Sequence, residues 1–191
     1  MVQEIEHEYR TLISEEKYTQ LVATFIDKNA RHLSFVNYYF DDKDLTLTNL
    51  EMVLRVRQKS PTEYKLTLKT NLNGSSLETT QKISSTEFYQ LQKGLFPDGE
   101  IKNKIKDIVN TGSLHLVAIL ANDRLEITYE NHLIVLDKST YNNIIDYTLE
   151  VEGNTLEIAK RKFEEILKIF NIEVTKNTLT KSKRAIYTKL N

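Results

Sequence analysis

The stretch EIEHEYR, residues 4–10, decides how the rest of the chain is interpreted. It has an acidic residue at every second position and ends on an arginine. Side chains of a β-strand alternate between its two faces, so in a strand the three glutamates and Arg10 point the same way. The pattern predicts a strand over 3–10 with three carboxylates on one face. The three charges repel one another unless water, a cation or a ligand neutralises them.

Composition narrows the class of protein. The 191 residues carry a net charge of −1 and no cysteine, which gives no reason to expect nucleic acid as a partner and excludes disulfide or thiolate chemistry. No linker, repeat or secretory segment is found, and the longest apolar run, 114–121, is too short to span a bilayer. We expect one cytoplasmic domain over 1–191, monomeric or homodimeric, with no membrane partner.

Alternating apolar and polar residues, interrupted by turn signals, indicate an antiparallel sheet with helices in an α+β fold. The expected strands are 3–10, 34–42, 51–59, 63–71, 76–83, 113–120, 124–130, 132–138 and 146–152. The expected turns include 60–62, 73–74, 121–123 and 130–131. Helices are expected over 15–26, 85–95, 99–110, 155–170 and near the C-terminus. Ser14 is the expected N-cap of the first helix, and Asn154 with Glu157 that of the helix over 155–170.

Several of these strands carry charges of one sign on one face, such as Arg55 with Arg57 and Lys65 with Lys69. Residues two apart on a strand are roughly 6.7 Å apart. Two like charges at that distance repel by about 2.5 kcal/mol at an effective dielectric near 20. An ordinary half-buried sheet with its charges in water explains any single strand. Carboxylates that bind Mg²⁺ or Mn²⁺, and cations that bind phosphate oxygens, explain all of them together.

The motif Glu6-x-Glu8-x-Arg10 resembles the ExExK signature of the CYTH superfamily, also called triphosphate tunnel metalloenzymes. Further matches follow in the family's order: NYYFDD from Asn37, LRVR ending at Arg57, LTLK ending at Lys69, NDRLEITY with Arg124, LIVLDKSTY with Asp137, DYTLEVE ending at Glu152, and KSK over 181–183. The resemblance extends from residue 4 to about 185. The chain is most similar in pattern to uncharacterised CYTH-domain proteins of Gram-positive bacteria.

The resemblance implies an eight-stranded antiparallel closed β-barrel, a tunnel with a charged lumen flanked by helices. It also implies a divalent-metal-dependent triphosphatase, a hydrolase acting on phosphoric anhydrides. The implied metal ligands for Mg²⁺ or Mn²⁺ are Glu6, Glu8, Asp137, Glu150 and Glu152, of which the last three would also orient the attacking water. The implied substrate-binding residues are Arg10, Arg55, Arg57, Lys65, Lys69, Arg124, and Lys181 or Lys183. The sequence departs from the family pattern at Arg10, usually lysine, at Asn122, often basic, and at Thr148, often acidic.

Inorganic triphosphate is the expected substrate, because no base-recognition motif stands out. Thiamine triphosphatase and class IV adenylyl cyclase activity on the same site stay open, as does a non-catalytic polyphosphate- or nucleotide-binding protein. The four histidines show no metal-ligand spacing. The aromatic residues 38–40 are expected in the core rather than stacked on a base.

Overall fold

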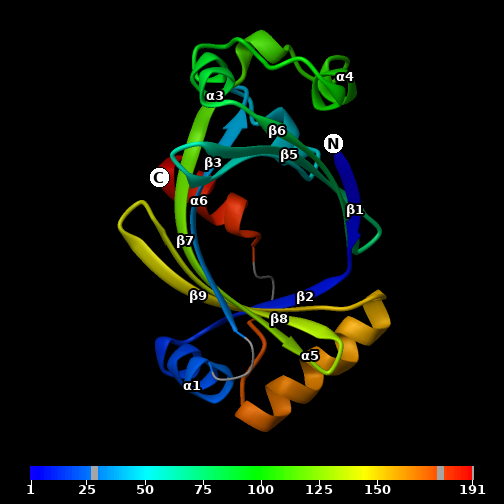
Figure 1. Ribbon diagram of the computed structural model, residues 1–191, viewed down its shortest axis with the longest axis vertical. Helices are drawn as coiled ribbons and strands as arrows, with labels where there is room; N and C mark the ends of the chain where they lie inside the picture. The colour runs from blue at the N-terminus through cyan, green and yellow to red at the C-terminus, as the bar shows by residue number, and fades with distance from the viewer. Residues whose placement is uncertain (27–29, 176–178, 191) are drawn as a thin grey trace. The chain divides into compact units, whose positions relative to one another are not determined.

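The computed structural model describes residues 1–26, 30–175 and 179–190 and shows an α+β fold, an antiparallel sheet flanked by helices (Figure 1). The strands in these residues are β1 (Val2–Glu6), β2 (Glu8–Ile13), β3 (Arg31–Asp41), β4 (Met52–Ser60), β5 (Glu63–Leu72), β6 (Ser75–Ile83), β7 (His115–Tyr129), β8 (His132–Tyr141) and β9 (Ile144–Glu152). The helices are α1 (Glu15–Phe25), α2 (Thr46–Asn49), α3 (Ser85–Leu91), α4 (Glu100–Ile105), α5 (Leu156–Phe170) and α6 (Lys181–Leu190), with a 3₁₀ turn at Thr111–Ser113.

The strand order is β1-β6-β5-β4-β3-β7-β8-β9-β2, so the sheet ends at β1 and β2. The single strand expected over 3–10 is therefore two strands, which His7 separates and which pair with different neighbours. The α+β class and the antiparallel sheet are confirmed. The described residues form nine strands in a sheet with two ends, whereas eight strands in a closed barrel were expected.

The chain forms two compact units, and the strands β1, β3 and β7 contribute residues to both. Unit 1 consists of Met1–Ile5, Phe35–Leu120 and Thr180–Asn191. Unit 2 consists of Glu6–Ser34 and Ala121–Leu179. A single domain over 1–191 stays a prediction.

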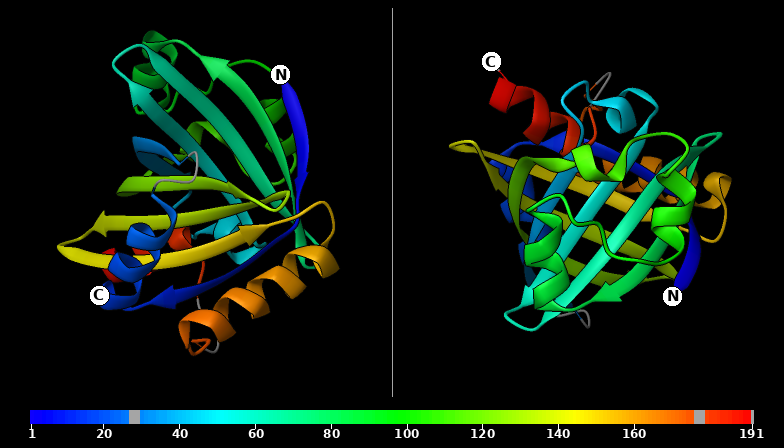
Figure 2. Two further views of the ribbon diagram at one scale, coloured as in Figure 1. Left: turned by 60° about the horizontal axis from the view of Figure 1, so that its bottom comes forward. Right: turned by 90° about the horizontal axis from the view of Figure 1, so that it is seen from above.

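In unit 1, one face of β4, β5 and β6 is apolar and packs against helices. Leu54, Leu66 and Leu68 lie in one buried cluster with Phe88 of α3 and Ile101 of α4, and Figure 2 (right) shows these two helices lying across the strands. Fully burying such side chains contributes roughly 1.5–3 kcal/mol each. Because strand side chains alternate, burying this face assigns the charged residues of the same strands to the opposite face.

The turn between β5 and β6 fixes their register. Asn73 and Gly74 have φ of 48° and 90°, the left-handed values that a tight two-residue hairpin requires. The turn expected at this position is confirmed.

In unit 2, the strands β7, β8, β9 and β2 have their apolar faces covered by α1 and α5 (Figure 1, bottom). Leu125, Leu136 and Leu149 lie in one buried cluster with Leu21 of α1 and Phe163 of α5. The expected amphipathic helices therefore cover the sheet. Burying this face again turns the acids of these strands to the other side.

The N-cap predictions had mixed outcomes. Ser14 caps α1 as expected, because its Oγ accepts a hydrogen bond from the Lys17 amide at 3.2 Å. The N-cap of α5 is Thr155, whose Oγ1 accepts from the Ile158 amide, so the prediction of Asn154 was wrong.

The turn expected over 121–123 was also wrong, since these residues lie inside the long strand β7. Asn122 and Asp123 resemble a turn when only their neighbours in sequence are considered. In the structure Asn122 pairs with Ser139 of β8 in the ladder, and its side chain is hydrogen-bonded there. No helix in the described part of the chain is long and apolar enough to cross a membrane.

Candidate functional site

The charged face of unit 2 brings together most of the acids expected to bind metal. The ladder between β2 and β9 places Glu8 opposite Glu152 and Arg10 opposite Glu150. Directly opposed residues of an antiparallel pair lie on the same face, about 4.5–5.5 Å apart. Within this face Arg10 donates to Glu8 at 2.6 Å, so one carboxylate already has a cationic partner.

The pKa of Glu152 shows that the carboxylates of this face repel one another. Burial raises its pKa, and the charges of Glu6, Glu150 and Glu8 raise it further, to about 8, despite the opposing effect of Arg124. A carboxyl that keeps its proton near neutral pH marks a region with more negative charge than the protein neutralises.

Arg124 is fixed by Asp137, which lies opposite it on β8. Its Nε donates to Asp137 Oδ1 at 2.8 Å and its Nη2 to Oδ2 at 2.7 Å, the bidentate geometry of a strong ion pair. Nη2 is also 3.4 Å from Glu150 Oε2. Burial opposes the charged form of Arg124, but the carboxylates of Asp137 and Glu150 outweigh it and raise the pKa of Arg124.

Two residues at which the sequence departs from the family pattern lie next to Asp137. The amide of Asn122 donates to Asp137 Oδ1 at 2.6 Å and accepts at its Oδ1 from the Ser139 hydroxyl at 2.8 Å. Thr148 is opposite Asp137 on β9, and its buried hydroxyl has no hydrogen-bond partner among the described residues. Burying such a group is costly, so Thr148 marks a polar position on this face that the described residues do not satisfy.

The donor chemistry of this face suits a divalent cation. Carboxylate oxygens are the ligands that Mg²⁺ and Mn²⁺ prefer, and a cation among the glutamates would relieve the repulsion that raises the pKa of Glu152. In residues 1–26, 30–175 and 179–190, however, no three acidic, histidine or cysteine side chains converge on one point as metal ligands. The acids fit a divalent cation in ligand type and charge, and not in the arrangement of their side chains among the described residues.

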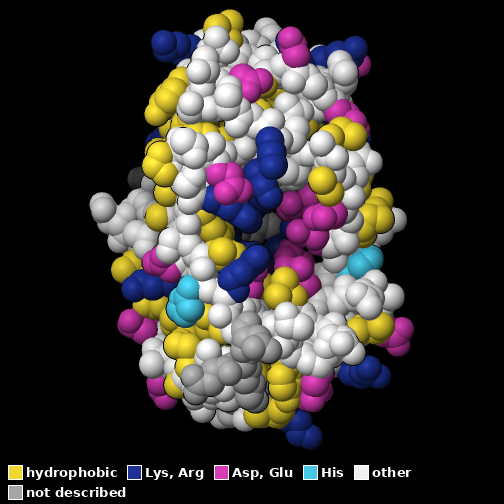
Figure 3. Space-filling view, viewed as in Figure 1, with side chains coloured by type: hydrophobic (Ala, Val, Ile, Leu, Met, Phe, Trp, Pro, Cys, Tyr) yellow, Lys and Arg dark blue, Asp and Glu magenta, His cyan; other side chains and the backbone are white. Residues whose placement is uncertain are grey.

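The basic residues expected to bind phosphate lie on the charged face of unit 1. The ladder places Arg57 opposite Lys65 and Arg55 opposite Thr67, and Lys69 lies two residues further along β5. On the face displayed in Figure 3, acidic side chains (magenta) lie together in groups, and so do basic side chains (dark blue).

Arg57 is held by two residues of β3. Its Nε donates to Asn37 Oδ1 at 3.1 Å, and its guanidinium lies 4.1 Å from the centre of the Phe35 ring. A hydrogen bond and a stacked ring together restrict the rotamers of the guanidinium. In the same unit the buried Nε of Arg55 has no partner in the described part of the chain.

Glu78 of β6 is an acid on this basic face that the sequence analysis missed. It lies opposite Lys69, with 3.5 Å between Nζ and Oε1, and its Oε2 is 3.4 Å from Arg55 Nη2. Burial raises the pKa of Glu78, but the charges of Arg55 and Lys69 outweigh this and lower it. The two-residue turn at 73–74 sets Lys69 opposite Glu78, so the register implied by that turn could have identified this residue.

Of the two C-terminal lysines, Lys181 affects a residue on the charged face of unit 1, because its charge lowers the pKa of Tyr39. Burial raises the pKa of Tyr39, which lies opposite Arg55, while the charges of Arg55, Arg57, Lys181 and Arg184 lower it. Lys183 instead has its Nζ 3.7 Å from the exposed carboxylate of Glu51. Arg184, which the sequence analysis missed, is buried with 8% of its surface exposed.

The aromatic residues 38–40 have different environments. Phe40 belongs to the core cluster of unit 1 and Tyr38 packs against it, as expected. Tyr39 is buried too, but among the cations of the opposite face.

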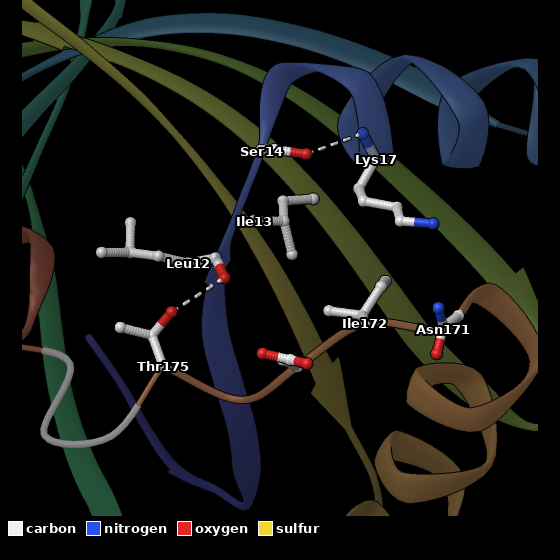
Figure 4. Close-up of a pocket in the computed structure, with 8 residues that line it drawn as sticks. Leu12, Ile13, Ser14, Lys17, Asn171, Ile172 and Thr175 are labelled. Carbon is white, nitrogen blue, oxygen red and sulfur yellow. Dashed lines mark hydrogen bonds between the residues drawn. The ribbon is translucent and has the colours of Figure 1, made fainter.

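A shallow pocket of about 340 Å³ in unit 2 contains none of the predicted site residues. Figure 4 shows that it lies beside the start of α1 and the segment after α5, with Ser14 and Lys17 on one side and Asn171, Ile172 and Thr175 on the other. Its lining has no cluster of charges that would suit a metal or a phosphate. We therefore place the candidate site on the charged sheet faces.

The proteins that this chain resembles carry two kinds of name, triphosphatase and adenylate cyclase. It is 31% identical over 182 residues to YjbK of Bacillus subtilis (strain 168), which carries the provisional name of triphosphatase, and 94% of each chain is covered. A crystal structure from Bacillus halodurans, provisionally described as an adenylate cyclase, shares 34% identity at a TM-score of 0.86 and covers 96% of this chain and 98% of that one.

A second similar structure shows that the fold persists at lower identity. The HpAC1 protein of Hippeastrum, provisionally described as an adenylyl cyclase and said to have a dominant triphosphatase activity, shares 20% identity. Its TM-score is 0.77, over 94% of this chain and 93% of that one.

The CYTH domain family matches residues 4–185. That range includes the acidic faces of β2 and β9, the Arg124–Asp137 pair and the basic strands β4 and β5. The order of motifs and the similarity to YjbK agree with this match. The chain belongs to the CYTH domain family.

Proposed function

We propose that this protein is a divalent-metal-dependent triphosphatase that hydrolyses the terminal phosphate of a triphosphate, with inorganic triphosphate as the expected substrate. Membership of the CYTH family and the similarity to YjbK support a triphosphatase. The observation that carries the proposal is the register of β2 and β9, which sets Glu8 opposite Glu152 and Arg10 opposite Glu150 on one face. Burial and the charges of Glu6, Glu150 and Glu8 raise the pKa of Glu152 there to about 8. Such an excess of negative charge is expected where a cation binds.

The proposed metal ligands are Glu6, Glu8, Glu150 and Glu152. When bound there, Mg²⁺ or Mn²⁺ supplies a Lewis acid for phosphate oxygens and lowers the pKa of a coordinated water. Glu150 and Glu152 would also orient the attacking water, because carboxylates on one strand face can accept hydrogen bonds from its O–H groups.

The proposed phosphate ligands are Arg10, Arg55, Arg57, Lys65, Lys69, Arg124 and Lys181. Arginine matches phosphate oxygens with two parallel N–H groups, and lysine adds a compact charge. The buried Nε of Arg55, which has no partner among the described residues, supports an anion at this face, because a buried donor without an acceptor is costly. Lys183 stays a prediction of the family pattern.

We further propose that the strands close into one eight-stranded barrel within a single cytoplasmic domain. The acids and the cations would then bind the same triphosphate. The strand order supports the barrel, because its two end strands β1 and β2 are separated in sequence only by His7. Counted as one bent strand, they give eight strands in a cyclic order.

Adenylyl cyclase activity is a second candidate, which the name of the Bacillus halodurans relative favours. Thiamine triphosphatase activity uses the same phosphate chemistry. A protein that binds triphosphate without hydrolysing it requires the same cations but no oriented water.

A phosphate-release panel tests these candidates. The purified protein is incubated with tripolyphosphate, thiamine triphosphate or ATP, each with Mg²⁺, Mn²⁺ or chelator, and products are analysed for phosphate and cyclic AMP. We expect metal-dependent release of phosphate, fastest from tripolyphosphate. Cyclic AMP as the main product would establish the cyclase instead, and binding without any turnover would reduce the proposal to a binding protein.

A further inference from the structure

We infer that Asn122 and Ser139 are positioning residues: they fix the Asp137 carboxylate, which holds the Arg124 guanidinium in place to bind a phosphate. Asp137 therefore orients Arg124 and is not a metal ligand. The inference rests on the proposed function for the identity of the ligand. The family resemblance implies that Asp137 is a metal ligand, whereas here it orients Arg124. Asn122, which stands where the family often has a basic residue, steadies Asp137.

The contacts of Asp137 show why it orients Arg124. Its side chain has no exposed surface, and both of its oxygens accept hydrogen bonds from Arg124, at 2.8 and 2.7 Å. Oδ1 accepts a second bond from Asn122 at 2.6 Å. An sp² oxygen offers two lone pairs, so Oδ1 is fully used. A metal ion at Oδ1 would have to displace Asn122 or the guanidinium, and one at Oδ2 would bring a second cation next to Arg124, so this carboxylate is a poor metal ligand.

The Asn122 amide is itself fixed in direction. The hydroxyl of Ser139 donates to Asn122 Oδ1 at 2.8 Å, which leaves the amide nitrogen facing Asp137. Both residues are buried, with 3% of Asn122 and none of Ser139 exposed. The pair is neutral, so it steadies Asp137 without competing with Arg124 for the negative charge. These contacts also keep 121–123 in the strand instead of in a turn.

Arg124 remains the member of this network that a ligand can reach. Its side chain keeps 13% exposure, whereas that of Asp137 has none. Its Nη2 is 3.4 Å from Glu150, so it lies beside a proposed metal ligand. A guanidinium whose direction is set in advance binds phosphate without paying again for rotamer entropy.

The test compares Asn122→Ala, Ser139→Ala and Asp137→Asn with the matched control Thr140→Ala, an exposed β8 position next to Ser139. Calorimetry measures tripolyphosphate binding in chelator and, separately, Mn²⁺ binding without phosphate. We expect tripolyphosphate affinity to fall about tenfold in the three variants, as for loss of one charged hydrogen bond. Mn²⁺ affinity and the control should be unchanged. In an Arg124→Gln background, Asn122→Ala should have no further effect.

A ligand-free measurement keeps the inference testable if Asp137→Asn does not fold. The Nε–H signal of Arg124, identified in NMR spectra by its absence in Arg124→Lys, should exchange slowly with water in the wild type and faster in Ser139→Ala. Unchanged exchange, or a loss of Mn²⁺ affinity in Asp137→Asn equal to that in Glu150→Gln, overturns the inference alone. A wild type that binds neither ligand overturns the proposed function and this inference with it.

Discussion

Lys69 and Glu78 lie opposite each other on β5 and β6, with 3.5 Å between the ammonium nitrogen and a carboxylate oxygen. Arg55 approaches the same carboxylate at 3.4 Å. The proposed phosphate-binding face thus contains an anion of its own when no ligand is present, which offsets part of the repulsion among its cations.

Glu78→Gln should destabilise the protein at neutral pH and not at acidic pH. The pKa of Glu78 is lowered from its ordinary 4.5, because Arg55 and Lys69 outweigh the effect of burial. A lowered carboxyl pKa stabilises the fold above the unfolded-state value, and that stabilisation is lost as pH falls through the folded-state pKa. We expect a loss of roughly 1–3 kcal/mol at pH 7. Thermal unfolding of both proteins from pH 7 to pH 3 measures it.

The wild type and the variant should then converge in melting temperature at the acidic end of this series. A difference that stays constant with pH would mean that Gln disturbs packing and that the charge of Glu78 contributes nothing.

Glu150→Gln should remove phosphate release while leaving the fold intact. The substitution keeps the shape of a side chain that is 7% exposed and removes one charge from the proposed metal ligands. Loss of a ligand that also orients water is expected to lower turnover by about 10²-fold or more. Steady-state hydrolysis of tripolyphosphate with Mg²⁺ or Mn²⁺ measures this.

Glu164→Gln on the outside of α5 is the matched control, since that side chain is 61% exposed. It should retain wild-type activity. Equal rates for Glu150→Gln and the wild type would remove Glu150 from the proposed metal site.

Sequence alone could predict the faces of the strands. The alternation in β4 and β5 assigns Arg55, Arg57, Lys65 and Lys69 to one face, and the turn at 73–74 fixes the register with β6. These are local properties, because a period of two and a two-residue turn depend only on neighbouring residues.

The features that sequence could not predict depend on partners far along the chain. Asn122 is held in β7 by Asp137 and Ser139, and no rule that considers neighbouring residues includes those contacts. The break at His7 follows from β1 pairing with β6 while β2 pairs with β9. The family pattern identifies Asp137 but not the guanidinium that occupies both of its oxygens.

Glu152→Gln should raise the melting temperature of the metal-free protein. Burial and three neighbouring glutamates raise the pKa of Glu152 to about 8, so its charge opposes folding. The sign follows from linkage: a raised carboxyl pKa makes stability fall as pH rises from about 4.5 towards 8, because only the folded state keeps the proton. The gain in the variant should therefore grow over that range in chelator, as measured by thermal unfolding.

With Mn²⁺ present the order should reverse. The wild type gains stability by binding the ion, and Glu152→Gln, which lacks one ligand, gains less. A variant that is no more stable than the wild type in chelator at pH 8 would show that repulsion among the acids of this face does not destabilise the fold.

Arg57→Lys should weaken tripolyphosphate binding although it keeps the charge. Lysine cannot donate to Asn37 from a planar group or stack on Phe35, both of which hold Arg57 in the structure. It also loses the paired N–H groups that match phosphate oxygens, so we expect about tenfold weaker binding. Calorimetry in chelator measures the affinity without turnover. Arg161→Lys, at an exposed position of α5, is the control and should bind as the wild type does. Equal affinities for Arg57→Lys and wild type would reduce the role of Arg57 to that of a general positive charge.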